Sequence, residues 1–387
     1  MKEMKLLSIS HSCVVSEYRK RMAEVTKYPD IELTLLVPKC WRQFNKRVDL
    51  EKETDDYYQI LSVQPITWGF RKNSFQNVTH VYMGIRKILE KLRPDIIELW
   101  EEPFSAVSAH TTFWGGRIVP KAKLIFFSAQ NVLKKYPFPF SMFEAYTYKN
   151  AKYAFLMNQD VLDVVRKKGY DKEFAILPLG VDTDVFYKKD VSFLKKRLAL
   201  KDFVIGFMGK IDRQKGILDL IEAVSGVKEP MQLLIIGNGE LKGEIEHRIR
   251  LLGLQQKTIL MDAVPHSQVP DYLNCMDLLV CPSVTLPNVK EQFGRVIVEA
   301  MACEVPVIGS DSGEIPVTIG KAGLIFEEGD VRDLREKIRG IVKNRNLRGM
   351  LAKNGRRRVT ENFTWKVIVE KQYQVYKELM NQEKWPT

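Results

Sequence analysis

Short apolar runs alternate with segments of helical periodicity along the whole chain. The runs are mostly continuous, which is typical of strands buried on both faces of a parallel sheet. Between them, apolar residues recur every three or four positions, as in 217–224. The sequence therefore predicts an α/β protein with doubly wound sheets. The expected strands are 5–10, 32–38, 95–101, 122–129, 153–158, 174–180, 203–210, 232–239, 258–262, 277–283, 305–311 and 323–329.

These strands form two series, which indicates two open sheets joined near 178–186. We expect an N-terminal Rossmann-like domain over 1–181 and a C-terminal one over 182–365. Ligands of such sheets bind at the carboxyl ends of the strands, so the cleft between the two domains is the expected site. The last helix, about 366–387, is expected to pack back on the N-terminal domain.

Composition narrows the class of protein. The chain has 387 residues, 45% of them apolar, and a net charge of +12, which suits anionic partners. No nucleic-acid-binding signature accompanies the charge, so we expect no nucleic acid partner. Five cysteines without a CxxC pair favour a reducing compartment. No run approaches the roughly 18 apolar residues of a spanning helix. We expect a cytoplasmic protein, with peripheral contact to the inner face of the plasma membrane left open.

The segment EQFGRVIVEAMA, 291–302, carries two glutamates, Glu291 and Glu299. Gly294 is expected to break the helical pattern, so that Glu291 lies in a loop and the helix begins near Arg295. Unpaired amide groups and the positive end of the helix dipole then converge, a geometry that binds anions. The loop amides concerned are those of Gln292, Phe293 and Gly294.

A basic turn, GKIDRQKG, follows the strand expected at 203–210. Its cations are Lys210, Arg213 and Lys215, and its glycines Gly209 and Gly216 permit close backbone approach. Such a turn can neutralise a diphosphate, although a solvated basic turn is the alternative. The Walker A spacing and the GxGxxG fingerprint are absent, which disfavours P-loop chemistry and hydride transfer.

The order of these motifs resembles that of the retaining GT-B glycosyltransferases of family 4. The similarity covers essentially the whole chain and is most specific in EQFG, EAMA and MACEVPVIGSD. It implies that Lys210 and Lys215 contact the donor diphosphate, that Glu291, Phe293 and Gly294 hold the donor sugar, and that Glu299 binds the ribose. Further donor-side positions implied by the resemblance are Gly209, Arg213, Gly237, Gly239, Val264 and Gln292.

The chain departs from the family pattern at several positions. Lys210 replaces a usual arginine, which keeps the charge but loses a bidentate grip. SISHSC, 8–13, replaces a glycine-rich loop, and Glu304 replaces a frequent glycine. Many members have a histidine where this chain has LWEEPFS, 99–105, which places Glu101 or Glu102 near the reacting carbon.

The acceptor side is expected to involve His11, Glu101, Glu102, Gln130 and Asn131. A bacterial group of family 4 shares EEPFS, QN and YPFPF with this chain. Alternatives are that the two glutamates cap the following helix and that His11 is a surface histidine. For the other histidines, His80 among them, we favour a structural role.

The expected reaction is transfer of a hexose-type sugar with retention, by front-face substitution. The donor is expected to be a UDP- or GDP-sugar, and the acceptor a glycan, a lipid-linked molecule or a small molecule. No metal or other cofactor is expected, because DTD, 182–184, reads as a turn in the connector. Competing hypotheses are a GT-B nucleotide-sugar epimerase and a non-catalytic sugar-nucleotide-binding protein.

A last segment, KKYPFPFSMF, 134–143, combines lysines, aromatic residues and prolines. Together with WRQFNKR, 41–47, it could form a basic, aromatic rim that touches anionic lipid. An ordered loop packed on its own domain is equally consistent with this composition.

Overall fold

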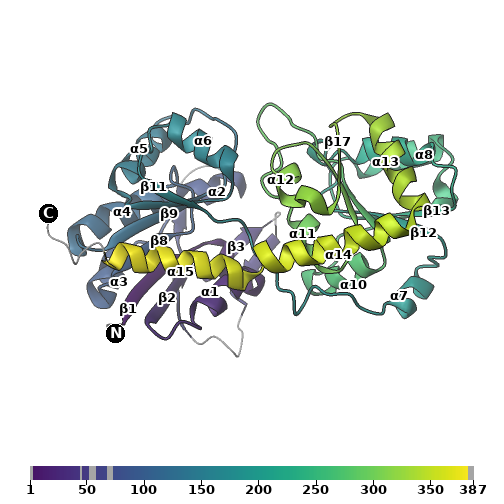
Figure 1. Ribbon diagram of the computed structural model, residues 1–387. Helices are drawn as coiled ribbons and strands as arrows, with labels where there is room; N and C mark the ends of the chain where they lie inside the picture. The colour runs from purple at the N-terminus through teal and green to yellow at the C-terminus, as the bar shows by residue number, and fades with distance from the viewer. Residues whose placement is uncertain (1–2, 44–45, 52–57, 68–72, 382–387) are drawn as a thin grey trace. The chain divides into compact units, whose positions relative to one another are not determined.

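The computed structural model describes residues 3–43, 46–51, 58–67 and 73–381. The chain divides into two compact units. Unit 1 comprises Met1–Pro178 and Trp365–Thr387, and unit 2 comprises Leu179–Thr364 (Figure 1). The chain therefore passes between the units twice, within a few residues of the positions expected from the sequence.

Unit 1 is built on a seven-stranded sheet with the order β11-β10-β9-β8-β1-β2-β5. Every pair in it is parallel. The strands are β1 (Met4–Ile9), β2 (Ile31–Val37), β5 (Gln59–Ser62), β8 (Ile96–Leu99), β9 (Lys123–Ser128), β10 (Tyr153–Leu156) and β11 (Glu173–Ile176). Two short antiparallel pairs accompany the sheet: β3 (Cys40–Gln43) with β4 (Lys46–Asp49), and β6 (Ile66–Thr67) with β7 (His80–Val81).

Helices connect the strands of unit 1. They are α1 (Lys20–Val25), α2 (Asn73–Thr79), α3 (Ile85–Leu92), α4 (Ala106–Ile118), α5 (Phe140–Asn150), α6 (Gln159–Lys167) and the C-terminal α15 (Trp365–Asn381). Helix α15 packs against α1, so the expected return of the last helix to the N-terminal unit is observed (Figure 1).

A buried carboxylate explains how α15 is held. Glu98, on β8, is fully buried, and the guanidinium of Arg21 donates to both of its oxygens at 2.9–3.0 Å. From α15, the amide of Gln372 and the hydroxyl of Tyr376 donate to Oε1 of Glu98 at 2.6 and 2.8 Å. A buried charge is costly unless it is paired and hydrogen-bonded, so these donors fix the helix on the sheet.

Unit 2 contains a six-stranded parallel sheet with the order β14-β13-β12-β15-β16-β17. The strands are β12 (Phe203–Met208), β13 (Met231–Ile236), β14 (Thr258–Met261), β15 (Leu278–Cys281), β16 (Val307–Ser310) and β17 (Leu324–Phe326). The helices are α7 (Ser192–Arg197), α8 (Ile217–Ser225), α9 (Lys242–Leu251), α10 (Val269–Asn274), α11 (Arg295–Ala302), α12 (Ile315–Ile319), α13 (Val331–Lys343) and α14 (Arg345–Asn362). The apolar faces of α8, α9 and α13 bury against β12, β13 and β15.

The expected α/β, doubly wound architecture with two Rossmann-like sheets is confirmed. Each of the expected strands is present, with ends that differ by a few residues. Strand β5 and the two antiparallel pairs were not predicted from the sequence. Strand β5 lies at the sheet edge and is only partly buried, so it lacks the continuous apolar run that marks the others.

Candidate functional site

Each sheet has one point at which its strand order reverses. In unit 2, the chain proceeds from β12 through β13 to β14 and then continues at β15, on the other side of β12. The connections after β12 and β15 therefore lead to opposite sides of β12, and the carboxyl ends of these two strands form the topological switch point of the sheet. Open α/β sheets bind their ligands at this point.

A lysine and a glutamate meet at this switch point. Lys215 follows β12, Glu291 follows β15, and Nζ of Lys215 donates to Oε2 of Glu291 at 2.6 Å. The hydroxyl of Ser283 donates to the same oxygen at 2.9 Å. Burial alone lowers the pKa of Lys215, but the charge of Glu291 and the hydrogen bond to it raise the pKa above its ordinary value. The ammonium group of Lys215 is thus a fixed positive charge at the switch point.

The turn that carries Lys215 is shaped by its neighbours. The side chain of Asp212 accepts from the amide of Lys215 at 3.2 Å and caps a short 3-10 turn. Gly216 ends the turn with φ +62°, and a Cβ there would lie 1.8 Å from the carbonyl oxygen of Pro282. The turn after β12 therefore packs tightly on the loop after β15, and only glycine fits at the contact.

The other cations of the turn face solvent. Lys210 pairs with Asp212 at 2.8 Å, and its side chain is 62% exposed. Arg213 is exposed as well. Lys215 differs from both because it is mostly buried against Glu291. The basic turn thus combines one largely buried ammonium group with two exposed cationic side chains.

Helix α11 begins at Arg295, as expected, and Gly294 precedes it with φ +74°. The carbonyl oxygen of Glu291 accepts from the amide of Glu314, which fixes the loop. The ring of Phe293 is buried and lies against Phe363, so it contributes to the core. Gln292 is exposed. The loop before α11 is therefore ordered next to a positive helix end.

Glu299 lies on α11 and is 5% exposed. The guanidinium of Arg295, one turn earlier, lies 2.9 Å from its carboxylate and also contacts His266 at 3.2 Å. Arg295 was expected only as the start of the helix. Its spacing of four residues before Glu299 was the signal for this pair.

The remaining donor-side positions lie at the carboxyl ends of neighbouring strands. Gly209 follows β12, Gly237 and Gly239 follow β13, and Val264 follows β14. A Cβ on Gly237 would lie 1.8 Å from the carbonyl oxygen of Gly209, so the two loops are in close contact. The structure therefore places all of these positions on one edge of the unit 2 sheet.

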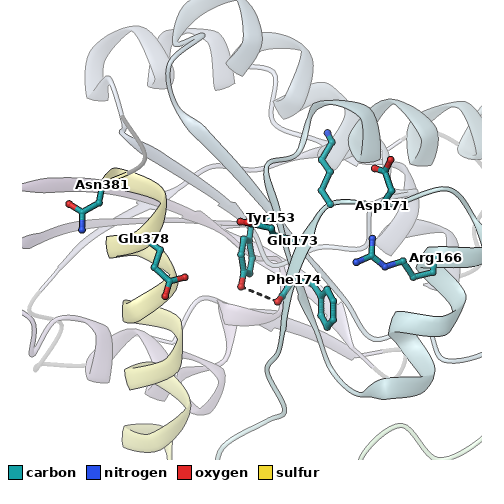
Figure 2. Close-up of a pocket in the computed structure, with 8 residues that line it drawn as sticks. Tyr153, Arg166, Asp171, Glu173, Phe174, Glu378 and Asn381 are labelled. Atoms are coloured by element: carbon teal, nitrogen blue, oxygen red, sulfur yellow. Dashed lines mark hydrogen bonds between the residues drawn. The ribbon is translucent and has the colours of Figure 1, made fainter. Parts of the chain in front are cut away.

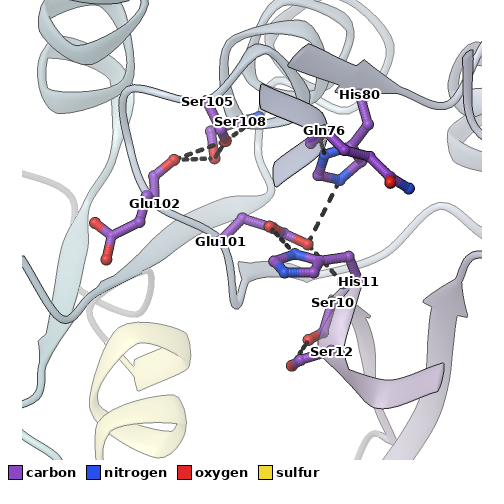
Figure 3. A network of polar contacts seen from close by, with 9 residues as sticks. All are labelled: Ser10, His11, Ser12, Gln76, His80, Glu101, Glu102, Ser105 and Ser108. Atoms are coloured by element: carbon purple, nitrogen blue, oxygen red, sulfur yellow. Dashed lines mark hydrogen bonds and ion pairs between the residues drawn. The ribbon is translucent and has the colours of Figure 1, made fainter. Parts of the chain in front are cut away.

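Unit 1 has an equivalent arrangement. Its strand order reverses between β1 and β8, where Ile9 is in register with Leu99. His11 and Glu101 each stand two residues beyond this pair. Glu101 accepts from the backbone amide of His11 at 2.6 Å, and its Oε2 lies 2.6 Å from Nδ1 of the same histidine (Figure 3). His11 therefore has a specific partner.

The two adjacent glutamates have opposite environments. Burial by itself raises the pKa of Glu101, but the neighbouring imidazoles of His11 and His80 lower it to about 2. The side chain of Glu102 points away from this cluster (Figure 3). It accepts from the hydroxyl of Ser128 at 2.7 Å and from the amide of Ala129 at 2.9 Å. Burial raises the pKa of Glu102 to about 7.

Helix α4 is capped by Ser105, whose side chain accepts from the amide of Ser108. The alternative that Glu101 or Glu102 caps this helix is therefore wrong. Both carboxylates are instead committed to groups at the carboxyl ends of β1 and β9.

Gln130 and Asn131 lie directly after β9. The side chain of Gln130 donates to the carbonyl of Val132 at 2.9 Å, and Asn131 is 4% exposed.

Asp182 of the DTD segment accepts from the amide of Asp184 at 3.0 Å, as expected of a turn.

The two segments expected to form a basic, aromatic rim, 134–143 and 41–47, differ in how exposed their aromatic side chains are. In the segment 134–143, Phe138 is 78% exposed, whereas Tyr136 stacks on Phe104. Trp41 is buried, so it belongs to the core and does not contribute to a rim; residues 44–45 lie outside the described residues. Among the described helices, none is long and apolar enough to cross a membrane.

A separate pocket of about 850 Å³ in unit 1 is lined by polar side chains, including Tyr153, Arg166, Glu173 and Glu378 (Figure 2). Tyr153 and Glu173 begin strands β10 and β11, so the pocket lies at the amino ends of these strands. Ligands of doubly wound sheets bind at the opposite edge. We therefore assign this pocket no part in the site.

Comparison with known proteins gives a family match within unit 2 and relatives that cover about half of the chain. Residues 188–358, just under half of the chain, match the family of group 1 glycosyl transferases. The chain is 31% identical over 218 residues to the capsular polysaccharide biosynthesis glycosyltransferase CapM of Staphylococcus aureus, covering 53% of this chain and 56% of that protein. It is 26% identical over 210 residues to the N-acetyl-alpha-D-glucosaminyl L-malate synthase of Bacillus anthracis, covering 53% of each. The chain thus spans about half the length of the curated relatives it matches.

Solved structures resemble the chain over almost its whole length. The sucrose-phosphate synthase of Thermosynechococcus elongatus has a TM-score of 0.74 at 19% identity, covering 98% of this chain and all of that one. HepE of Anabaena, solved with UDP and glucose, has a TM-score of 0.71 at 15% identity, covering 97% of this chain and all of that one. The fold is therefore that of the GT-B glycosyltransferases, and this part of the expected resemblance is confirmed.

Proposed function

We propose that the protein is a retaining glycosyltransferase of family 4 that transfers a hexose-type sugar from a UDP- or GDP-sugar to a hydroxyl acceptor. The observation that carries the proposal is the Lys215–Glu291 pair across the reversal point of the unit 2 sheet. The matched group 1 family covers this region, and the similar HepE structure contains UDP and glucose.

In the proposed donor complex, the diphosphate lies between the basic turn and the start of α11. Lys215 and Lys210 supply positive charge, and the amides before α11 supply hydrogen-bond donors. Glu291 accepts hydrogen bonds from the donor sugar, and Glu299 accepts from the ribose. These roles come from the family resemblance, and the shared edge of the sheet is consistent with them.

The proposed chemistry needs no protein nucleophile. The acceptor oxygen attacks the anomeric carbon on the face from which the diphosphate leaves. The bond from that carbon to the phosphate oxygen breaks, and the departing phosphate oxygen takes the acceptor's proton. Lys215, Lys210 and the helix end stabilise the charge that develops on the leaving group. We propose that they do so without a metal ion at the diphosphate.

The acceptor is proposed to be a glycan, a lipid-linked molecule or a small molecule. A surface feature favours contact with a lipid. An apolar pocket of about 490 Å³ is lined in part by Met142 and Phe143 of the segment 134–143, which also carries the exposed Phe138. The same segment begins with Lys134 and Lys135. We propose peripheral binding to anionic membranes through this face, with the protein in the cytoplasm. Binding to acidic vesicles no stronger than to neutral ones would contradict it.

A nucleotide-release assay with a panel of UDP-, GDP- and ADP-sugars tests the proposed function. Transfer to an acceptor with the anomeric configuration retained by NMR supports it. An epimerised nucleotide sugar would indicate an epimerase, and binding without turnover would indicate a sugar-nucleotide-binding protein. An inverted product would contradict the front-face mechanism.

A further inference from the structure

Three side chains of unit 1 present metal-ligand atoms to one point. His11 follows β1, Glu101 follows β8 and His80 begins β7, and one ligand atom of each lies within 4.8 Å of the other two (Figure 3). The expected catalytic scheme assigns His80 no role. Two imidazoles and one carboxylate are nevertheless a ligand set that proteins use for zinc.

The hydrogen bonding of His80 leaves one of its ring nitrogens available. Nδ1 lies 3.2 Å from the carbonyl oxygen of Gln76, which can only accept, so Nδ1 carries the proton. In the neutral ring, Nε2 then has a lone pair. Within the described part of the chain, this buried atom makes no hydrogen bond. It instead faces Oε1 of Glu101 at 3.6 Å.

The 3.6 Å between Nε2 of His80 and Oε1 of Glu101 fits a bridging cation better than a direct hydrogen bond. Charge-assisted N–H···O bonds are about 2.7–2.9 Å long, well below the observed distance. In a tetrahedral zinc site with bonds of about 2.0–2.2 Å, neighbouring ligand atoms lie about 3.3–3.5 Å apart. The 2.6 Å contact between His11 and Glu101 is shorter, so metal binding must replace the proton there and widen that contact.

The surroundings are those of a supported metal site. Ligating histidines usually donate their second ring N–H to a carbonyl or carboxylate, and the contact of His80 with Gln76 is of this kind. Trp41 and Tyr82 flank the histidine rings and are almost fully buried. The side chain of His11 is 21% exposed, which provides a path to solvent, whereas those of His80 and Glu101 are fully buried.

We propose that His11, His80 and Glu101 bind one divalent transition-metal ion of the zinc class. Mixed nitrogen and oxygen ligands disfavour Mg²⁺ and Ca²⁺, which prefer oxygen alone. Three protein ligands leave one coordination position for water or a hydroxyl group. This site is in unit 1, so it is distinct from the proposed diphosphate site of unit 2 and does not depend on the proposed function.

The test uses the full chain without an affinity tag, stripped with EDTA and exchanged into metal-free buffer. Zn²⁺ binding is measured by calorimetry, and Co²⁺ binding is followed by its visible absorption. We expect one equivalent of Zn²⁺ and the intense d–d bands of tetrahedral Co²⁺. His80→Gln and His11→Gln should each weaken Zn²⁺ binding at least about tenfold.

His110→Gln is the matched control, because His110 lies in the same unit but outside the cluster, where its Nε2 accepts from the indole N–H of Trp114 at 3.2 Å. It should leave Zn²⁺ binding unchanged. If His80→Gln does not fold, His11→Gln decides, because its side chain is partly exposed. Absence of Zn²⁺ binding by the parent chain would overturn the proposal. Equal Zn²⁺ binding by the parent chain and the His11 variant would also overturn the proposal. Thiolate-to-Co²⁺ charge-transfer bands would overturn it as well, because they would show that cysteines bind the metal.

Discussion

Nζ of Lys215 lies 2.6 Å from Oε2 of Glu291, although the two residues follow different strands of the unit 2 sheet. The pair occupies the point at which the strand order reverses. His11 and Glu101 bridge the corresponding point of the unit 1 sheet at the same distance. Both units thus hold an oppositely charged or chargeable pair where their folds favour a ligand.

The first prediction concerns the unit 2 pair. Lys215→Ala and Glu291→Ala should each lower kcat/KM by several orders of magnitude, because one removes the fixed charge and the other a sugar contact. Steady-state kinetics of nucleotide release measures this. Lys337→Ala, which breaks an ion pair with Asp333 on α13 of the same unit, is the control and should be near normal. Turnover of the Lys215 or Glu291 variants at the control's rate would remove these residues from the site.

The second prediction concerns Lys210, whose side chain is exposed and pairs with Asp212. Lys210→Ala should weaken nucleoside diphosphate binding by about tenfold, equivalent to about 1.4 kcal/mol. Lys210→Arg should bind at least as well as the parent, because arginine keeps the charge and can grip phosphate with two nitrogens. Calorimetry with UDP and GDP distinguishes the variants. Equal affinity of all three would place Lys210 outside the diphosphate contact.

The third prediction is a pH dependence. Glu291 raises the pKa of Lys215 above its ordinary value of 10.5, so the positive charge is lost only as the pH rises through that higher pKa. In Glu291→Gln, the charge that offsets the effect of burial is lost, so the pKa of Lys215 should fall. Affinity for nucleoside diphosphate should therefore decline at a lower pH in this variant, in a titration from about pH 7 to about pH 10. Parallel profiles would show that the pair does not set the charge of Lys215.

The fourth prediction concerns the stability of unit 1. Tyr376→Phe removes one donor to the buried carboxylate of Glu98 and should lower the free energy of unfolding by about 1.5–3 kcal/mol. Tyr373→Phe, on the same helix, removes a contact with Asp30 that is only partly buried, and should cost less than about 1 kcal/mol. Urea unfolding measures both. A larger loss in the Tyr373 variant would contradict the importance of the Glu98 network.

The fifth prediction concerns metal removal. Binding of nucleoside diphosphate should be the same before and after EDTA treatment, because lysines and backbone amides supply the positive charge in unit 2. Thermal shift with UDP or GDP provides the measurement. Loss of binding that Mn²⁺ restores would show that a metal ion bridges the diphosphate.

Much of the fold follows from the sequence, because strands buried on both faces need continuous apolar runs. Edge strand β5 has no such run and was missed. Proximity across the sheets is harder to predict. Lys215 and Glu291 are 76 residues apart in the chain, and the motifs identify each without showing that they touch.

The position of His80 had no sequence signal. It lies on a two-residue strand paired with β6, and only the folded chain brings it to Glu101. The differing environments of Glu101 and Glu102 were equally hidden, because these residues follow β8 in irregular backbone, where the sequence does not show which way each side chain points. Local pattern identifies candidate groups, whereas the topology decides which groups meet.

Helix α15 makes unit 1 discontinuous in the sequence. Unit 2 is one uninterrupted stretch, whereas unit 1 is completed only by residues encoded after it. Unit 2 therefore lies between the two segments of the chain that form unit 1. A single cut at the first junction would leave the carboxylate of Glu98 without the two donors that α15 provides. Exchange of whole units between related proteins therefore requires two crossover points.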